Sequence, residues 1–337
     1  MKKILAATSA IVLTNAISAS NVTLYGVMDT SIGKLNTPGL GIKTDSWGLI
    51  SGKSLNTGTS RFGMRGIEDL GGGWEARFQL EDGFDMTKGT TGLSGGQFFS
   101  RQSNVSLKGP IGEILLGRGY NAAAYALMPW EMTVIGLESV VANQFGVVGG
   151  GPRDSNMILY KSPIFSGFSF VADVVPKGDA SYGTPENPKG KYDISASYVS
   201  KSISIGAGYN KVQDGNEAYT VGGAYDFGKF KLAASWNQTK LDKPDASGND
   251  ILHKGYSLGG QTRFGKFFFM LDVAHDTRLG DTDVVAEGRY SLSKRTFLYT
   301  IFFHDGKGKI TATNPKIPGT NLNSNINGYS IGIRHNF

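Results

Sequence analysis

Histidine is the side chain best suited to acid–base catalysis near neutral pH, and this 337-residue chain contains four. A hydrolase would need one of them beside a serine nucleophile and a carboxylate or amide. No H-E-x-x-H metalloprotease motif occurs, and the four histidines are spread over the ends of predicted strands: His253, His275, His304 and His335. We therefore expect solvated histidines, no catalytic residue and no enzymatic activity.

Cofactor and metal sites have equally little support. The absence of cysteine excludes disulfides, thiolate metal sites and cysteine nucleophiles. The segment GLGIKT at 39–44 lacks the third glycine and the following helix of a dinucleotide site. Loop aspartates such as Asp242 and Asp250 lack EF-hand spacing, which leaves weak binding of a divalent cation as an open alternative. We predict no cofactor and no bound metal.

The first nineteen residues have the pattern of a secretion signal. Lys2 and Lys3 precede a short apolar stretch, residues 4–17, and Ser18-Ala19 supplies small residues for cleavage. The alternative, a membrane-anchoring helix, is disfavoured because the stretch is shorter than the roughly 20 apolar residues that a span needs. Loss of this leader lowers the net charge from +6 to +4, and no basic run typical of nucleic-acid binders remains.

Composition narrows the class of protein further. Glycine is about twice as frequent as usual, with 48 residues, while charged residues make up only 18%. Aromatic residues reach 11%, which argues against disorder. The mean hydropathy of −0.18 is too polar for a bundle of membrane helices. An exported, cysteine-free chain of this kind fits a bacterial envelope.

The recurring pattern has period two, which is the period of a β-strand. In residues 74–81, Trp, Ala, Phe and Leu alternate with Glu, Arg, Gln and Glu. This pattern predicts about sixteen strands, beginning near Val22, Ser60, Gly73, Phe99, Gly112, Ser155, Gly167, Tyr192, Ile203, Tyr219, Phe230, Tyr256, Phe267, Asp283, Phe297 and Gly328. Short turns alternate with long polar loops, such as 35–59 and 239–253, as in outer-membrane barrels.

A soluble β-sandwich also alternates, but here the apolar face is rich in aromatic residues near strand ends, as in the interfacial girdles of membrane barrels. Lipid requires closure, because an open edge would leave backbone groups unpaired in hydrocarbon. The sequence therefore predicts an all-β, antiparallel transmembrane barrel with an even number of strands over residues 20–337.

Several segments resemble the general-diffusion porins of Gram-negative bacteria, in particular the neisserial and betaproteobacterial branch. They are NVTLYGVMDT (21–30), TSRFGMRGIEDLGGGWEARFQLE (59–81), RQSNVSLKGPIGEILLGR (101–118), RDSNMILYKSPIFSGFSF (153–170), LSKRTFLYTIF (292–302) and GIRHNF (332–337). The resemblance implies an outer-membrane homotrimer of 16-stranded barrels. It also implies a constriction loop folded into each lumen, here about residues 119–152, whose alanine-rich start at 121–128 can form a short helix before Pro129.

In that family, carboxylates on the loop face basic side chains of the barrel wall at the narrowest point. Carried over by motif, the resemblance implies six constriction residues: Arg61 of TSRFG, Glu81 of FQLE, Arg101 of RQSNV, Arg153 of RDSNM, and Glu131 and Glu138 of the loop. Opposed charges across a narrow pore create a transverse field that orders water and penalises apolar solutes. The alternation pattern supports a lumen position for Arg61, Glu81 and Arg153. For Arg101 it leaves two alternatives, the lumen or the subunit contact, because Arg101 has the parity of Val105 and Leu107.

Other residues receive secondary roles. Arg65 and Arg77 share the predicted inner face and are expected to line the lumen away from the constriction. We expect Arg118 to anchor the base of the loop or to contact a neighbouring subunit. Phe337, in phase with outward residues of the last predicted strand, resembles the signal that the outer-membrane insertion machinery reads in this family.

The predicted function is a water-filled channel for passive diffusion of ions and small hydrophilic solutes across the outer membrane. Three arginines and three glutamates at the constriction would balance, but arginine is always charged and Glu138 is the weaker assignment, which favours a mild anion preference. Lipopolysaccharide and the insertion machinery are the other expected partners, and nucleic acid is not. A surface adhesin or receptor acting through its long loops, and a substrate-specific channel, remain the alternatives.

Overall fold

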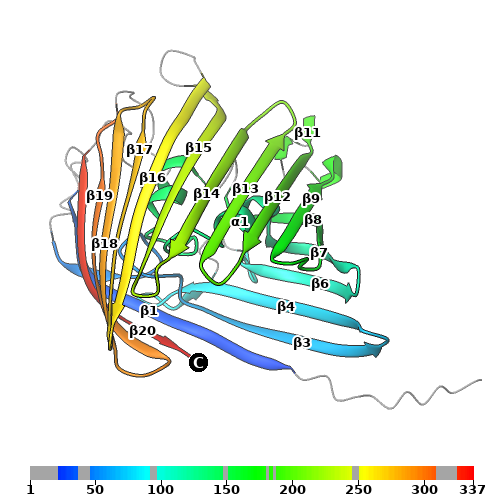
Figure 1. Ribbon diagram of the computed structural model, residues 1–337, viewed down its shortest axis with the longest axis horizontal. Coiled ribbons are helices and arrows are strands. Elements are labelled where there is room, and N and C mark those ends of the chain that lie inside the picture. The colour runs from blue at the N-terminus through cyan, green and yellow to red at the C-terminus, as the bar shows by residue number, and fades with distance from the viewer. Residues whose placement is uncertain are drawn as a thin grey trace, which may run out of the picture.

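The computed structural model describes residues 22–36, 46–91, 97–146, 151–179, 182–184, 187–244, 250–308 and 325–337. Within these ranges, sixteen strands form one antiparallel sheet that closes on itself, because β1 pairs with both β3 and β20 (Figure 1). The chain is therefore the predicted 16-stranded β-barrel. The predicted leader, residues 1–19, lies outside the described residues.

The barrel strands follow one another in chain order: β1 (Thr23–Asn36), β3 (Arg61–Gly71), β4 (Trp74–Asp85), β6 (Gln102–Gly109), β7 (Gly112–Tyr120), β8 (Arg153–Lys161), β9 (Phe168–Val175), β12 (Lys191–Val199), β13 (Ile203–Val212), β14 (Glu217–Asp226), β15 (Phe230–Pro244), β16 (Asp250–Phe264), β17 (Phe267–Asp276), β18 (Asp281–Ser291), β19 (Thr296–Asp305) and β20 (Ile326–Asn336). The short strands β2 (Gly48–Ile50) and β5 (Thr90–Thr91) pair with β1 and β4. A separate hairpin joins β10 (Tyr182–Thr184) and β11 (Asn187–Lys189), next to the short 3₁₀ helix η1 (Lys177–Asp179).

One predicted loop is much shorter than expected. The polar stretch 239–253 continues the β15–β16 ladder, in which Thr239 pairs with His253 and Leu241 with Ile251. Only residues 245–249 separate the two strands, and they lie outside the described residues. Polar residues can extend a strand beyond the lipid band, because water satisfies both of its faces there.

The two faces of the strands differ as the alternation predicts. On β15, Leu232 and Trp236 point outward and are 45% and 40% exposed, whereas Ser235 and Asn237 point inward and are buried. An outward apolar face is the surface that lipid requires. Among the described helices, none combines the length and hydrophobicity of a membrane-crossing helix.

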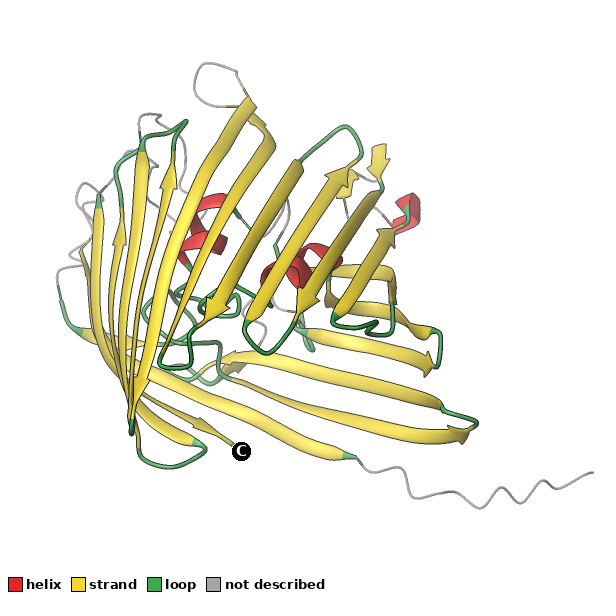
Figure 2. Ribbon diagram, in the orientation of Figure 1, coloured by secondary structure: helices red, strands yellow, loops and turns green. Residues whose placement is uncertain are grey.

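The barrel interior is occupied by the segment between β7 and β8. It contains α1 (Ala122–Leu127), capped by Asn121, and α2 (Val140–Phe145), capped by Ser139. Figure 2 shows these helices within the space that the strands enclose, with α1 against β12 and β13 and α2 against β16 to β18. Gly222 allows this approach, since a methyl group there would lie 2.3 Å from the Trp130 ring.

Candidate functional site

Three arginines lie at or immediately before the first residues of barrel strands. Arg61 is the first residue of β3 and pairs with Val27, in the first half of β1. Arg153 is the first residue of β8, and Arg101 lies immediately before β6. Buried residues 55–60 precede Arg61, and the segment that fills the barrel interior precedes Arg153, so these two side chains lie beside the lumen.

Glu81 on β4 joins two of these arginines. Its carboxylate accepts a hydrogen bond of 2.6 Å from Arg101 Nε and lies 3.5 Å from Arg61 Nε. The backbone N–H of Arg101 also donates to the Glu81 carbonyl oxygen, at 3.1 Å. Strand parity does not set the direction of Arg101, because the residue precedes the regular strand. Its side chain extends to the inner face.

Arg153 has no such partner. Its guanidinium lies over the Tyr120 ring, 4.0 Å from the ring centroid, and its buried Nε makes no hydrogen bond. Arg101 and Glu81 are among the charges that act on it. In the described part of the chain, Arg153 forms no ion pair within 4.0 Å. The wall therefore carries three cations and one shared carboxylate, named here the arginine wall: Arg61, Glu81, Arg101 and Arg153.

The structure places Glu131 differently from the sequence expectation. The side chain is only 2% exposed, and its carboxylate accepts hydrogen bonds from Thr133 N, Ile135 N and the Ser139 hydroxyl at 2.8–2.9 Å. This turn contains left-handed backbone at Val134 and Ile135, with φ of 54° and 58°. Such conformations are costly for these residues, and the bonds to Glu131 stabilise the turn. Glu131 thus faces the loop's own backbone rather than the pore.

Glu138 is also withdrawn from the lumen surface. It is fully buried, and its Oε1 lies 4.0 Å from Arg289 Nη2, while Arg289 is held by two hydrogen bonds from its side chain to Glu287. Burial, reinforced by the charges of Glu287 and Glu131, raises the pKa of Glu138 well above its ordinary value, although Arg289 opposes the shift. Neither carboxyl oxygen has a hydrogen-bond partner among the described residues.

A second inward segment, residues 51–60, was not anticipated, because the sequence suggested an outer loop over 35–59. Its residues from Leu55 to Ser60 are buried. Asn56 Nδ2 donates to Tyr299 Oη at 3.0 Å, and the Leu55 carbonyl accepts from the hydroxyls of Ser31 and Ser330. These bonds attach the segment to β19, β1 and β20. The stretch SLNTGTS gives no local signal for this position, since the contacts are with strands distant in sequence.

This segment brings one more arginine to the lumen. Arg334 Nη1 donates to the Thr57 carbonyl at 3.1 Å. A methyl group on Gly58 would lie 3.1 Å from Arg334 Nη1 and 3.8 Å from Arg61 Nη1, so the two guanidinium groups flank this glycine. Arg334 makes no ion pair within 4.0 Å in the part of the chain described. Its parity, opposite to outward Ile331 and Ile333, was the signal that could have identified it.

Together these elements divide the inner circumference of the barrel. The constriction loop covers β9 and β12 to β18 through α1 and α2. The segment 51–60 covers β19, β20 and β1. The sector from β3 to β8 keeps its polar inner side chains, and these include the arginine wall. The cationic side chains of the arginine wall therefore lie in the sector that neither inward segment covers.

The remaining predicted residues lie around this site. Arg65 lies over the Tyr25 ring, with 5.4 Å to the centroid, and Arg77 pairs with Glu75; both are on the inner face toward the β3–β4 turn. Arg118 donates to the Ser100 carbonyl at 2.5 Å and to Ser155 Oγ at 2.8 Å. These two bonds tie the starts of β6 and β8 to the end of β7, at the base of the loop.

Phe337 closes the seam between the first and last strands. Its N–H donates to the Gly26 carbonyl at 3.0 Å, and its carbonyl accepts from Gly26 N–H at 3.1 Å. The ring lies across Gly26, where a methyl group would come within 2.3 Å of it. The last residue therefore adds one more pair to the β1–β20 ladder.

The histidines are more ordered than expected. His253 is buried, with Nδ1 2.9 Å from Asp276 Oδ2, so the expectation of a solvated side chain is wrong for this residue. The others bond neutral side chains through Nδ1, His275 to Thr282, His304 to Asn327 and His335 to Thr296. His253 is buried because its strand continues into the predicted loop region.

Comparisons with known proteins agree with this architecture. The family model described as Gram-negative porin matches residues 6–305. The chain is 32% identical, over the full length of both chains, to Outer membrane porin protein 32 of Delftia acidovorans. It is 27% identical to the major outer membrane protein P.IB of Neisseria gonorrhoeae, with 93% of this chain and 97% of that protein covered. A solved anion-selective porin from Comamonas acidovorans has a TM-score of 0.75 and 27% identity, and the match covers 94% of this chain and 100% of that one.

Proposed function

The chain belongs to the Gram-negative porin family and forms a passive channel in the bacterial outer membrane, and from that premise we propose that the channel has a mild preference for anions. Gram-negative porins are a non-enzymatic channel family. The narrowed lumen supports a channel rather than a surface receptor, because a receptor acting through its outer loops has no need of a constriction.

The charge balance at the arginine wall carries this proposal. Arg61 and Arg101 share one carboxylate, that of Glu81, and Arg153 lies over the Tyr120 ring. The two loop acids that would balance them are buried away from the pore, Glu131 by hydrogen bonds and Glu138 by packing. An aqueous cleft with low-dielectric walls and an excess of one sign of charge concentrates ions of the opposite sign. The relative solved as an anion-selective porin supports the same sign.

The decisive experiment is the reversal potential of the channel in a planar bilayer separating two KCl concentrations. We expect the sign of an anion-preferring channel, with a larger potential at low salt, where screening is weaker. Replacing Arg61 or Arg153 by Ser is expected to shift the potential toward cations and to increase the conductance. Lys201→Ser is the matched control, since Lys201 lies in an exposed turn between β12 and β13. Clear cation selectivity of the unmodified channel in dilute KCl would reject the proposal.

We further propose that the protein assembles as a homotrimer, with lipopolysaccharide around its outer loops. The outward apolar side chains support burial of the barrel surface against lipid or against another subunit. Such a trimer should migrate as a large, heat-dissociable species in gel electrophoresis. A monomer at all temperatures under mild detergent conditions would contradict the assembly without affecting the channel.

Phe337 is proposed as the residue that the insertion machinery recognises. Its deletion should leave chains in the periplasm, while a barrel refolded in detergent forms in nearly normal yield. Gly26→Ala is the matched control, because it disturbs the same contact with Phe337 and keeps the terminal residue. Equal losses in cells and in detergent for the deletion would assign Phe337 a purely structural role.

A further inference from the structure

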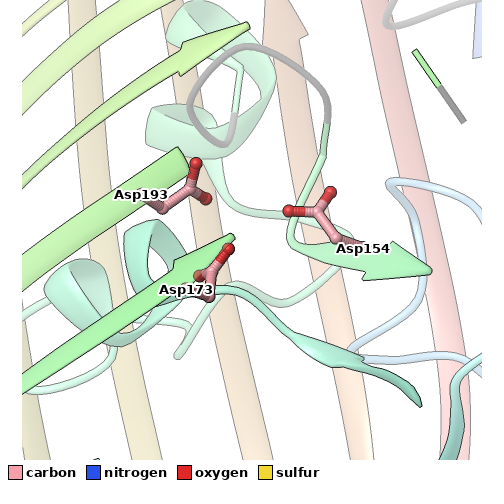
Figure 3. A group of neighbouring side chains, drawn as sticks. All are labelled: Asp154, Asp173 and Asp193. Atoms are coloured by element: carbon pink, nitrogen blue, oxygen red, sulfur yellow. The ribbon is translucent and has the colours of Figure 1, made fainter. Parts of the chain in front are cut away.

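Three aspartates converge inside the barrel next to the base of the constriction loop. They are Asp154 on β8, Asp173 on β9 and Asp193 on β12 (Figure 3), and their ligand atoms lie within 4.8 Å of one another. All three side chains are buried. Carboxylates at this spacing are typical of a divalent-cation site.

A lysine already supplies positive charge to this group. Lys191 Nζ lies 2.5 Å from Asp154 Oδ2 and 3.0 Å from Asp193 Oδ2, and its side chain is 0% exposed. The contact with Asp154 is a charge-assisted hydrogen bond, which is stronger than a neutral one, and the contact with Asp193 is an ion pair. Lys191 thus occupies the position where a metal ion would bind Asp154 and Asp193.

The same aspartates hold the constriction loop. Asn121, which caps α1, donates from Nδ2 to Asp154 Oδ2 at 3.2 Å and to the Gly151 carbonyl at 2.9 Å. The backbone N–H of Ala122 donates to Asp173 Oδ2 at 2.5 Å. The cluster therefore fastens both ends of the loop to three neighbouring strands of the wall.

Charge makes this attachment dependent on Lys191. In the cluster, three carboxylates face the single ammonium of Lys191, and Oδ1 of Asp173 and of Asp193 make no hydrogen bonds. Removing the lysine would leave three buried carboxylates within a few ångströms of one another. Carboxylates so placed repel one another and are poorly solvated, so the group would take up protons or a cation, or would separate.

We propose that Lys191 is a built-in cation that replaces a divalent metal ion and positions the constriction loop. It is a positioning residue of the pore, acting through the aspartates and Asn121 on the start of α1. The conductance readout of this inference rests on the proposed function, because it assumes that the loop sets the width of the channel. The position of the loop itself can be measured independently.

The test compares Lys191→Met with the unmodified protein. We expect a larger and noisier single-channel conductance in the variant, and millimolar Ca²⁺ should restore the steady level by occupying the three carboxylates. Ca²⁺ should leave the unmodified channel unchanged. Lys211→Met is the matched control, since Lys211 on β13 forms a partly exposed ion pair with Glu217 on β14.

A thiol probe reports the loop position without any assumption about conductance, and the chain has no native cysteine. Leu127→Cys places a thiol on α1 at a residue only 1% exposed. Labelling by a membrane-impermeant methanethiosulfonate should be slow with Lys191 present, at least tenfold faster with Lys191→Met, and slow again in Ca²⁺. If Lys191→Met labels faster as expected but conducts like the unmodified protein, Lys191 still positions the loop. The loop then does not set the width of the channel.

The double variant Lys191→Met/Asp193→Asn covers the case in which the single variant does not fold. It removes one charge of each sign, so loop position and conductance should return toward those of the unmodified protein, with little response to Ca²⁺. The inference is overturned if Lys191→Met labels and conducts like the unmodified protein. It is equally overturned if the single variant is altered but neither Ca²⁺ nor the Asp193 substitution corrects it.

Discussion

Arg153 and Asp154 are neighbours in the chain, yet they belong to two charge groups with different roles in the same barrel. Arg153 joins the arginine wall, whose arginines are partly exposed and outnumber its one carboxylate. Asp154 belongs to the Lys191 group, which is buried and contains three carboxyl groups beside one ammonium. Exposure decides the role, because a charge on the lumen surface acts on passing ions, whereas a buried charge acts on the groups packed around it.

Stability should separate the two groups most strongly. Lys191→Met removes the ammonium from a buried group, and breaking a buried ion pair in this way costs about 3–5 kcal/mol. Arg153→Met, the matched variant, removes a half-buried charge that has no carboxylate partner among the described residues, so it leaves no buried carboxylate unpaired and should cost less than Lys191→Met. Denaturant unfolding in detergent measures both. Equal losses in the free energy of unfolding for the two variants would show that the two charge groups do not differ in their contribution to stability.

Ion selectivity should respond in the opposite order. A unit charge about 5 Å from an ion in water changes its energy by about 0.8 kcal/mol, so Arg153→Ser should lower the anion-to-cation permeability ratio roughly twofold to fourfold, less at high salt. Arg334→Ser should act in the same direction, because Arg334 and Arg61 flank Gly58. Reversal potentials in a KCl gradient provide the measurement. No shift for Arg334→Ser would place that residue outside the ion path.

The loop acids Glu131 and Glu138 test the same difference between exposed and buried charges. They were expected to face the pore, but both are buried. Glu131→Gln should weaken the turn around Val134 and cost about 1–3 kcal/mol, because the N–H groups of Thr133 and Ile135 share Oε2 while the Ser139 hydroxyl donates to Oε1, and Gln keeps only one acceptor oxygen for these donors. Its effect on the reversal potential should be smaller than that of Arg153→Ser. A shift toward anions as large as the Arg153 shift toward cations would show that Glu131 faces the pore after all.

These differences show what sequence alone can predict for this fold. Alternation located every barrel strand, since an outward apolar and inward polar pattern is local, and only β16 begins well before its expected start. The direction of Arg101 could not be read from parity, because the residue stands before its strand. Lys191 stands one residue before the expected strand start at Tyr192. Its partners come from β8 and from its own strand, so the cluster forms only when β8, β9 and β12 pair side by side, which no local pattern shows. The direction of the Glu131 side chain depends on a turn with positive φ at Val134 and Ile135, which no local sequence pattern predicts.

The smallest expected effect concerns pH and Glu138. Burial raises the pKa of this carboxyl, so it is neutral at low pH and gains its charge as the pH rises through the raised value. That charge lies beside Arg289 and reduces the positive potential of the lumen, so anion preference should decline toward alkaline pH. Because the pKa is raised in the folded state, the contribution of Glu138 to stability is greatest below its unfolded pKa and is lost with rising pH.

Glu138→Gln should therefore flatten the decline of anion preference and improve stability at alkaline pH relative to the unmodified protein, with little change at acidic pH. Glu68→Gln is the control, since Glu68 is an exposed carboxylate on β3 away from the loop, and it should leave both pH profiles as they are. Reversal potentials and thermal unfolding measured across the pH range test the two expectations together. If the slope is the same with and without Glu138, the carboxyl keeps one charge state throughout, and its pairing with Arg289 is stronger than its burial.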